Sequence, residues 1–235
     1  SGMIVSVQQP YFCPYPGFFF KASACDVFVL MDDVQFPQGT TWTSRNRFKN
    51  DQGCLWMTVP VLRKGLGLQR INEVEICGGR WRKKHLESLK TAYRNAPYLA
   101  DHLGLFEEVF SPQYTRLADM NIAIIRYAMD FLGIETRLVL SSDLGLCERG
   151  SRLIVEVCSK LGGKVFLSQR SAWKYLDGDL FEQAGISLKP MIPPEIVYPQ
   201  LWGDFIGNLS VFDCIFNCGQ ASREIILKGK KRNLI

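Results

Sequence analysis

Three basic side chains recur at every second position of one short segment. Arg45, Arg47 and Lys49 are separated by single residues in the stretch RNRFKN. Because the side chains of a β-strand alternate between its two faces, a strand places all three cations on one face. Three cations with no acidic side chain between them indicate an anionic partner such as a pyrophosphate. A solvated outer face is the alternative that the same spacing allows.

A second basic group opens a predicted helix. Its members are Arg80, Arg82, Lys83 and Lys84. The positive end of the helix dipole makes cations unfavourable there, and an anionic ligand would offset the repulsion. His85 follows at the border of the apolar face of this helix. It is predicted to act as a general base or as a donor to phosphate, with a half-buried, hydrogen-bonded histidine as the alternative.

The segment from Gln8 to Gly17 contains three prolines, so it is predicted to be a rigid loop after a strand. Gly17 lies where a backbone could approach a phosphate at a helix N-terminus. A Pro-rich turn that only orients the chain is the alternative. Gln9, Tyr11 and Tyr15 are the polar side chains of this loop that we predict to contact a ligand.

Asp32 and Asp33 follow a predicted buried strand, and Gln35 comes shortly after them. A carboxylate in this place can hold a ribose hydroxyl, a Mg²⁺ ion or an amine. Strand alternation directs Asp32 and Asp33 to opposite faces, so at most one of them is expected to face the site. We predict a catalytic role for Asp33, with a turn-forming or helix-capping aspartate as the alternative.

Two further polar loops follow predicted strands, at 141–143 and 168–171. Ser142, Asp143, Ser168 and Arg170 are the ligand contacts predicted from them, although serine and aspartate also cap helices. The sequence contains no G-x-S-x-G elbow, no G-x-G-x-x-G, no Walker A and no H-E-x-x-H. No standard nucleophile or phosphate motif therefore identifies the chemistry.

Strands alternate with helices in both halves of the chain. This pattern predicts an α/β fold with a mostly parallel sheet flanked by helices. In such sheets ligands bind beyond the carboxyl ends of the strands. The polar loops are therefore predicted to meet at one edge. The predicted strands are 3–7, 26–31, 136–140, 164–167 and 186–191, the helices between them are 18–25, 148–161 and 171–184, and the loops are 8–17, 32–36, 141–143 and 168–171.

A different pattern separates the two halves. Segments 40–49 and 56–62 are rich in β-forming residues around a turn, which predicts a β-hairpin insertion, with 74–76 as a further strand. Two long helices follow, one ending near Pro97 and one at 117–132. We predict a single domain. Its parts are a β-α-β unit (3–39), a β-rich insertion (40–80), a helical part (81–134), a second β-α-β unit (135–192) and C-terminal helices (193–235, with 210–217 and 221–228 helical).

Composition narrows the class of protein. With 235 residues, 47% of them apolar and 22% charged, the chain can build one large core. A formal charge of +5 suits anionic small molecules and is too modest to predict nucleic-acid binding. No window approaches the ~20 apolar residues of a membrane helix. Eight scattered cysteines fit reduced thiols of the cytoplasm, and two histidines leave little for a bound transition metal.

Several blocks of the sequence resemble the WbqC-like protein family. The opening VQQPYFCPYPGFFFKASACDVFVLMDDVQFPQG, followed by RNRFKN and WMTVPV, is similar to the family's opening signature. Four further stretches of this chain resemble later blocks of the family, so the likeness extends from Met3 to about Glu224. They are WRKKHLESLKTAYRNAPY, the SSDL run, KVFLSQRSAWKYLD and the terminal LSVFDCIFNCG. One departure is visible. Where the family usually has Ser-Gly-Pro, this chain has Ser168-Gln169-Arg170, which alters a contact made there by a glycine backbone.

The resemblance implies a function, because such proteins are often encoded with O-antigen and other surface-polysaccharide genes. It implies a cytoplasmic enzyme, a transferase or ligase, that transfers an acyl, aminoacyl or nucleotidyl group to or from a nucleotide-linked amino sugar. The resemblance leaves the cofactor open, and Mg²⁺ bound together with a nucleotide is one candidate. Arg47 and Lys49 would neutralise phosphates and His85 would move a proton.

Two other functions remain open. One is a non-catalytic module that binds a ligand or another enzyme of the polysaccharide pathway. The other is RNA binding, suggested by the net charge and by Trp42 and Trp81. It ranks last because the cations cluster over short segments instead of forming a broad stripe.

A weaker likeness concerns the start of the chain. The first strand, the Pro-rich loop, Gly17 and the following helix and strand resemble the start of the nucleotidylyltransferase and pantothenate-synthetase superfamily. Those enzymes use an H-x-G-H motif, and the aligned positions here are Tyr15-Pro16-Gly17-Phe18. Since both histidines are missing, His85 or the row of Arg45, Arg47 and Lys49 would have to supply the charge.

Overall fold

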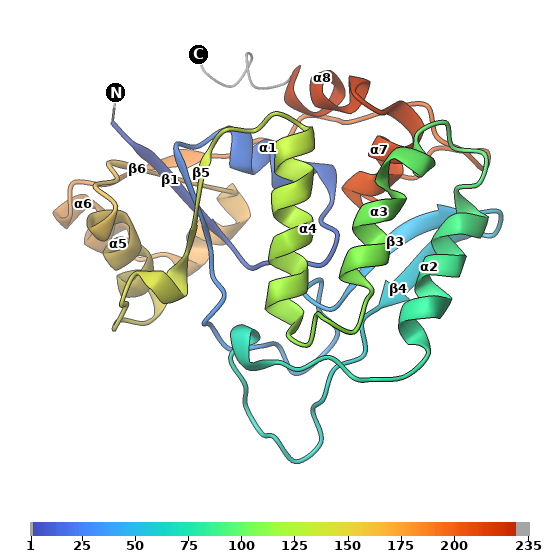
Figure 1. Ribbon diagram of the computed structural model, residues 1–235. Helices are drawn as coiled ribbons and strands as arrows, with labels where there is room; N and C mark the ends of the chain where they lie inside the picture. Colours follow the sequence, from blue (N-terminus) through green and yellow to red (C-terminus); the bar gives the residue numbers. More distant parts are fainter. Residues whose placement is uncertain (1, 229–235) are drawn as a thin grey trace.

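A parallel sheet of five strands forms the centre of the protein. A computed structural model describes residues 2–228 and places the strands in the order β5-β2-β1-β6-β7 (Figure 1). The order reverses between β1 and β6, which makes that boundary the topological switch point of the sheet. The predicted α/β class is confirmed. The strands are β1 (Ile4–Gln8), β2 (Val27–Leu30), β5 (Arg137–Leu140), β6 (Val165–Ser168) and β7 (Ser187–Pro190).

Helices cover both faces of this sheet, so its central strands are apolar on both sides. In β2, Phe28 and Leu30 belong to the larger core cluster, whereas Val27 and Val29 belong to a separate cluster on the other face. Such continuous apolar runs are typical of buried parallel strands. The covering helices are α1 (Pro16–Ser23) and α4 (Leu117–Phe131) on the first face and α5 (Gly150–Lys160) and α6 (Gly178–Gln183) on the second.

A hairpin and further helices lie beside the sheet (Figure 1). Strands β3 and β4 pair antiparallel as a separate two-stranded sheet, which confirms the predicted hairpin insertion. The elements of this part are β3 (Arg45–Asn50), β4 (Gly53–Thr58), α2 (Trp81–Ala92), α3 (Leu99–Val109), α7 (Val211–Cys218) and α8 (Ala221–Leu227).

Three details of the predicted elements were wrong. Helix α3 was not predicted, although its buried residues Leu99, Leu105 and Val109 have helical spacing. Segment 74–76 makes only isolated β-bridges and follows a short 3₁₀ helix, η1 (Ile71–Glu73). The predicted helix 171–184 consists of a 3₁₀ helix, η3 (Arg170–Tyr175), and the short α6, because Asp177 caps a new helix start between them.

The Pro-rich loop after β1 is held by two buried asparagine amides. Asn46 Nδ2 donates to the carbonyls of Phe12 and Cys13, at 2.9 Å each. Asn121 Nδ2 donates to the carbonyl of Pro10 at 2.9 Å and to that of Thr43 at 2.8 Å. Because this loop belongs to no β-ladder, its buried carbonyls need such side-chain donors.

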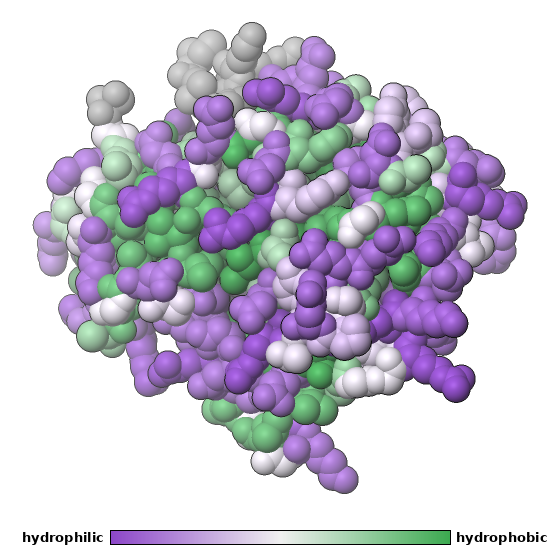
Figure 2. Space-filling model, in the orientation of Figure 1, coloured by the Kyte–Doolittle hydropathy of each residue, from purple (hydrophilic) through white to green (hydrophobic). Residues whose placement is uncertain are grey.

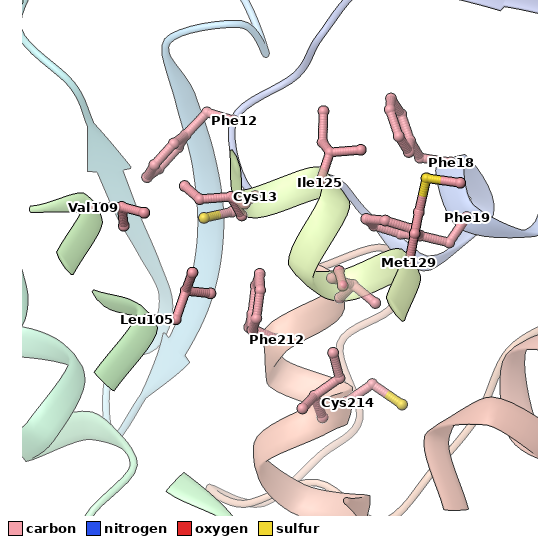
Figure 3. Packing of buried hydrophobic residues seen from close by; sticks show 14 of the residues in the cluster. Phe12, Cys13, Phe18, Phe19, Leu105, Val109, Ile125, Met129, Phe212 and Cys214 are labelled. Carbon is pink, nitrogen blue, oxygen red and sulfur yellow. The ribbon is translucent and has the colours of Figure 1, made fainter. Parts of the chain in front are cut away.

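The side chains of the same loop anchor it in the core. Phe12 and Cys13 are fully buried, and Figure 3 shows them beside Val109, Leu105 and Phe212. Cys13 has a φ of 41°, which is unusual for a residue other than glycine. The surrounding hydrogen bonds and packing hold this conformation, so the loop enters the site in one fixed shape.

The surface carries one projecting apolar loop. Leu62, Leu66 and Leu68 are 42%, 50% and 65% exposed on the segment between β4 and η1. This segment projects at the lower end of Figure 1, where Figure 2 shows a hydrophobic tip. No helix within residues 2–228 is long and apolar enough to cross a membrane.

Removing the Asn46 amide should destabilise the protein strongly. Asn46→Ala leaves two buried carbonyls without a donor, so we expect a loss of roughly 2–4 kcal/mol in the free energy of unfolding. Urea denaturation followed by circular dichroism measures it. Asn50→Ala is the matched control on the same strand, because its side chain accepts only the local Gln52 N–H, and it should change stability by less than ~0.5 kcal/mol. Equal losses in both variants would contradict this role of Asn46.

Candidate functional site

A pocket of about 320 Å³ lies where the Pro-rich loop meets the hairpin and the segment before α7. Its volume is at the lower end of the range of ligand pockets. We call it the Arg47 pocket. It is lined by Tyr11, Tyr15, Trp42, Asn46, Arg47 and Asn208.

Arg47 is the only cation in the lining of this pocket, and its charge is not neutralised. Its Nη2 donates to the carbonyl of Asn208 at 3.0 Å, while its Nε is buried without a hydrogen-bond partner. Within the described part of the chain, no carboxylate forms an ion pair with it. A guanidinium with unused donors is suited to bidentate binding of a phosphate or carboxylate.

Aromatic rings flank this cation. Trp42 and Trp56 stack with ring centroids 5.7 Å apart, and the Arg47 guanidinium carbon lies 5.7 Å and 5.8 Å from their centroids. The Arg45 guanidinium carbon lies 3.7 Å from the Trp56 centroid, so Arg45 and Arg47 contact the same ring and share one face of β3, as predicted. Trp42 remains 41% exposed beside the pocket, which leaves its ring available for stacking on a planar base.

Strands β1 and β6 separate close to this pocket. Their pairing covers only Ile4 and Val5 of β1, whereas pairing with β2 continues to Gln8. The Met3 carbonyl accepts hydrogen bonds from the chain entering β6, so it points towards β6. Carbonyl directions alternate along a strand, so the Val7 carbonyl, four residues later, also points towards β6.

Lys21 from α1 reaches the end of β1 at this point, and we call the place where Lys21, Val7 and Gln8 meet the β1–β6 crevice. Its Nζ donates to the Val7 carbonyl at 2.8 Å and to Gln8 Oε1 at 3.0 Å. Burial lowers the pKa of Lys21 to about 8, and Cys25 opposes this shift. Sequence reasoning missed Lys21. The available signal was a single lysine within the apolar run PGFFFKAS.

Tyr11 and Tyr15 stand between the Arg47 pocket and the β1–β6 crevice. Burial raises the pKa of Tyr11, while its hydrogen bond with the Gln8 side chain lowers it. Burial and the neighbouring Tyr11 raise the pKa of Tyr15, while hydrogen bonding with Gln169 lowers it. The two phenols line the pocket and also contact Gln8 and Gln169 at the ends of β1 and β6, so they connect the pocket with the point where these strands separate.

Gly17 makes room for a side chain of this wall. A Cβ atom at this position would lie 2.4 Å from Cε2 of Tyr15. The close approach that we predicted for a ligand is therefore made by the Tyr15 ring, which packs on the start of α1.

Asp32 and Asp33 form a separate group at the ends of β2 and β5. The Ser141 hydroxyl contacts a carboxylate oxygen of both residues, and the Ser142 hydroxyl donates to Asp32 at 2.6 Å. The prediction that the two carboxylates point to opposite faces was wrong, because β2 ends at Leu30 and strand alternation stops there. Neither aspartate lines the Arg47 pocket.

His85 lies away from the pocket, on α2 beyond the hairpin. Its Nε2 is 2.7 Å from the Thr58 carbonyl, which can only accept, so this nitrogen carries the proton. The ring packs against Trp81 and Phe110. This geometry is that of the half-buried, hydrogen-bonded histidine that we held as the alternative. Burial lowers its pKa, the Thr58 carbonyl opposes the shift and Lys84 adds to it.

Lys49 is also removed from the pocket, although it shares a strand face with Arg47. Its Nζ donates to Gln200 Oε1 at 2.8 Å and to the Asp204 carbonyl at 2.6 Å, and the residue is 1% exposed. The segment before α7 covers it. The prediction that Lys49 neutralises a ligand's phosphate therefore does not fit its position.

A buried carboxylate completes this arrangement. Asp213 accepts hydrogen bonds of 2.7 Å from Tyr93, Tyr198 and Gln200. Burial raises the pKa of Asp213, and Tyr198, Tyr93, Gln200 and Lys49 oppose the shift. The network fixes the segment that carries Asn208 over the hairpin, and so it closes one side of the Arg47 pocket.

The basic group at the start of α2 has structural partners. Arg82 donates to the carbonyls of Ser111 and Tyr114, at 2.8 Å each, and so holds α2 against the chain that follows α3. Lys84 is exposed and lines a hollow of about 410 Å³ that also contains Arg94, Asp51 and Glu87. The two carboxylates balance the two cations, which makes this hollow a weaker anion site than the Arg47 pocket.

The remaining predicted contacts are dispersed. Gln9 Oε1 accepts from the Thr43 hydroxyl at 3.5 Å, and Gln35 is exposed and forms a β-bridge with Arg70. Ser168 accepts from the Trp173 indole at 2.8 Å. Arg170, Ser142 and Asp143 are exposed. The four polar loops do follow parallel strands of one sheet, as predicted, but they form two groups at its edge.

A larger hollow, of about 960 Å³, lies elsewhere. Its walls include Asp26 and Thr136, at the amino ends of β2 and β5, so it opens on the edge opposite to the polar loops. It also includes Lys228, the last described residue. Among residues 2–228 no group of three or more His, Cys, Asp or Glu side chains could hold a metal ion.

Comparisons with known proteins point to one family. The family model described as "WbqC-like protein family" matches residues 9–225. The uncharacterised protein Rv1507c of Mycobacterium tuberculosis is 31% identical over 217 residues, which cover 92% of this chain and 94% of that protein. No solved structure matches.

An alanine at position 17 should disturb the wall of the pocket. Gly17→Ala forces the Tyr15 ring to move, and we expect it to cost roughly 1–3 kcal/mol in unfolding free energy. Gly104→Ala is the control, because it meets no atoms and lies within α3, where alanine should stabilise by ~0.5–1 kcal/mol. Combined with Tyr15→Ala, the cost of Gly17→Ala should largely vanish. A full cost in that background would exclude the ring as its cause.

With only two histidines in the sequence, the pKa of each imidazole can be measured separately. Burial lowers the pKa of both His85 and His102 below 6.5, so both should be neutral at pH 7. As pH falls below 6.5 the unfolded chain takes up protons first, and folding stability should decrease. NMR of the imidazole C–H signals measures the two pKa values, with His85→Gln for assignment. That variant should also show a shallower loss of stability with acid, and a His85 pKa above 6.5 would contradict the assignment of its environment.

Proposed function

Because this chain belongs to the WbqC-like protein family, we propose that it binds a nucleotide-linked sugar in the Arg47 pocket, as an enzyme of surface-polysaccharide biosynthesis. The observation that carries the proposal is the Arg47 guanidinium. It is half-buried in the lining of the pocket, donates to the Asn208 carbonyl and has no carboxylate partner in the described region. A diphosphate is the ligand group that best balances such a charge.

The pocket offers complementary groups for the rest of such a ligand. Trp42 can stack on the base, since its ring is 41% exposed beside Arg47. Tyr11 and Tyr15 are hydroxyl donors and acceptors along the side that leads to the carboxyl ends of β1 and β6. The sugar would extend in that direction, because ligands of parallel sheets bind beyond those strand ends.

The reaction that we propose is transfer of an acyl, aminoacyl or nucleotidyl group involving the amino sugar. Family membership and the anion-binding character of the pocket support it. The proton-transfer roles of His85 and Asp33 stay predictions, because neither side chain lines the Arg47 pocket. Asp33 is the nearer to a strand end, where it contacts Ser141.

Binding of UDP, dTDP and their amino-sugar conjugates by isothermal titration calorimetry tests the pocket. We expect Arg47→Met to weaken binding about 10–100-fold, as loss of a charge-assisted hydrogen bond does. Arg63→Met is the matched control. Arg63 also stacks on an aromatic ring, Phe36, and donates to backbone carbonyls, but it lies outside the pocket. Absence of binding by the wild-type protein at millimolar concentration, or equal weakening in both variants, would refute the proposed site.

Turnover distinguishes an enzyme from a binding module. Mass spectrometry of mixtures that contain a bound nucleotide sugar and acyl or aminoacyl donors should show a product with the wild-type protein and less with Arg47→Met. Binding that depends on Arg47 without product in any mixture would favour the non-catalytic module.

A further inference from the structure

We propose that the β1–β6 crevice is a second anion site, in which the Lys21 ammonium binds a phosphate or carboxylate oxygen of the substrate. The inference deepens the proposed function and rests on it for the identity of the substrate. The Arg47 pocket and the crevice would then hold two separate anionic groups, with Tyr11 and Tyr15 between them.

The backbone leaves an acceptor open at this site. Regular pairing with β6 ends at Val5, so the chain after Leu167 no longer supplies a donor to the Val7 carbonyl. Side chains make the hydrogen bonds here instead. Ser6 donates to the Leu167 carbonyl at 2.6 Å, and Lys21 donates to Val7. Lys21 therefore lies at the switch point itself, which is where open parallel sheets bind their ligands.

The partners of Lys21 leave its charge uncompensated. Both acceptors, the Val7 carbonyl and Gln8 Oε1, are neutral, and an ammonium has three donors. No Asp or Glu of residues 2–228 forms an ion pair with it. A charge that is largely withdrawn from water without a counterion costs stability, and an anionic ligand group would remove that cost.

The groups around the ammonium are suited to an oxyanion. Gln8 accepts from the ammonium on β1, and Tyr11 of the loop hydrogen-bonds the same Gln8 side chain. Gln169 approaches Tyr15 from the end of β6. These side chains are neutral hydrogen-bonding groups, and among residues 2–228 none of the ion pairs involves Lys21. The substrate class that fits is a nucleotide-linked sugar with a second acidic group, or a carboxylate-bearing donor held next to it.

Competitive lysine labelling tests the site on the wild-type protein. Limiting acetic anhydride is added with and without millimolar pyrophosphate or malonate, and the modified peptides are quantified by mass spectrometry. We expect either probe to slow acetylation of Lys21 at least about fivefold. Lys160 is the internal control, because it also donates to two backbone carbonyls but lies on α5, and its rate should not change. Unchanged labelling of Lys21 with both probes would overturn the proposal.

The two probes and one variant separate the outcomes. Protection by pyrophosphate alone identifies a phosphate site, and protection by malonate alone identifies a carboxylate site. Protection that persists in Arg47→Met shows that the crevice is distinct from the pocket, even if nucleotide sugars do not bind. Protection that disappears in Arg47→Met would show that the probe binds in the Arg47 pocket alone. That result would overturn the proposed second anion site.

The pH dependence adds a readout that a purely structural lysine would not give. Free Lys21 should become reactive near pH 8, because burial lowers its pKa. Cys25, which follows the end of α1, is the titratable group that acts on it, and Tyr11 is linked to it through Gln8. A bound anion stabilises the charged amine, so the probe should move the onset of reactivity to higher pH. An onset that the probe leaves unchanged would contradict anion binding.

Discussion

The carboxamide of Asn46 fixes the part of the chain on which the candidate site depends. It donates to the Phe12 and Cys13 carbonyls, and its own oxygen accepts the Arg47 N–H at 2.8 Å. One side chain therefore sets the distance between the Pro-rich loop and the strand that carries the guanidinium. Tyr11 and Tyr15 flank the two pinned carbonyls, so the position of each phenol follows from these bonds. A loop without ladder hydrogen bonds is rigid here because every one of these buried carbonyls has a donor.

The three cations on one face of β3 show how a shared face leads to different roles. Arg45 is stacked on Trp56, and Lys49 is buried under the segment that Asp213 anchors. Only Arg47 combines a position in a pocket with unused donors. The difference arises from what covers each residue. The covering segment belongs to residues about 150 positions further along the chain, as the contacts of Lys49 with Gln200 and Arg47 with Asn208 show.

The same reasoning explains what the sequence could predict. The α/β class and the polar loops at strand ends follow from local periodicity and turn residues, which neighbours in the chain determine. The position of His85 against Thr58 and the partners of Lys49 depend on long-range packing, which no periodicity encodes. Lys21 was missed for a related reason. A lone lysine in an apolar helix suggests a solvated side chain, and its burial depends on where β6 separates from β1.

The two uncompensated cations give the free protein a common property. Neither Arg47 nor Lys21 is paired with a carboxylate in the described chain, and each is partly withdrawn from water. Tyr11 lines the Arg47 pocket and also hydrogen-bonds Gln8, which accepts from Lys21, so a neutral phenol and a neutral amide link the two cations. An anion bound at either place removes the free-energy cost of the uncompensated charge there. Through Tyr11 and Tyr15 it also restricts the side-chain conformations at the other place. A substrate with two suitably spaced acidic groups would gain from both effects, whereas a single small anion would gain from only one. The geometry therefore favours a ligand of that extended, doubly anionic kind.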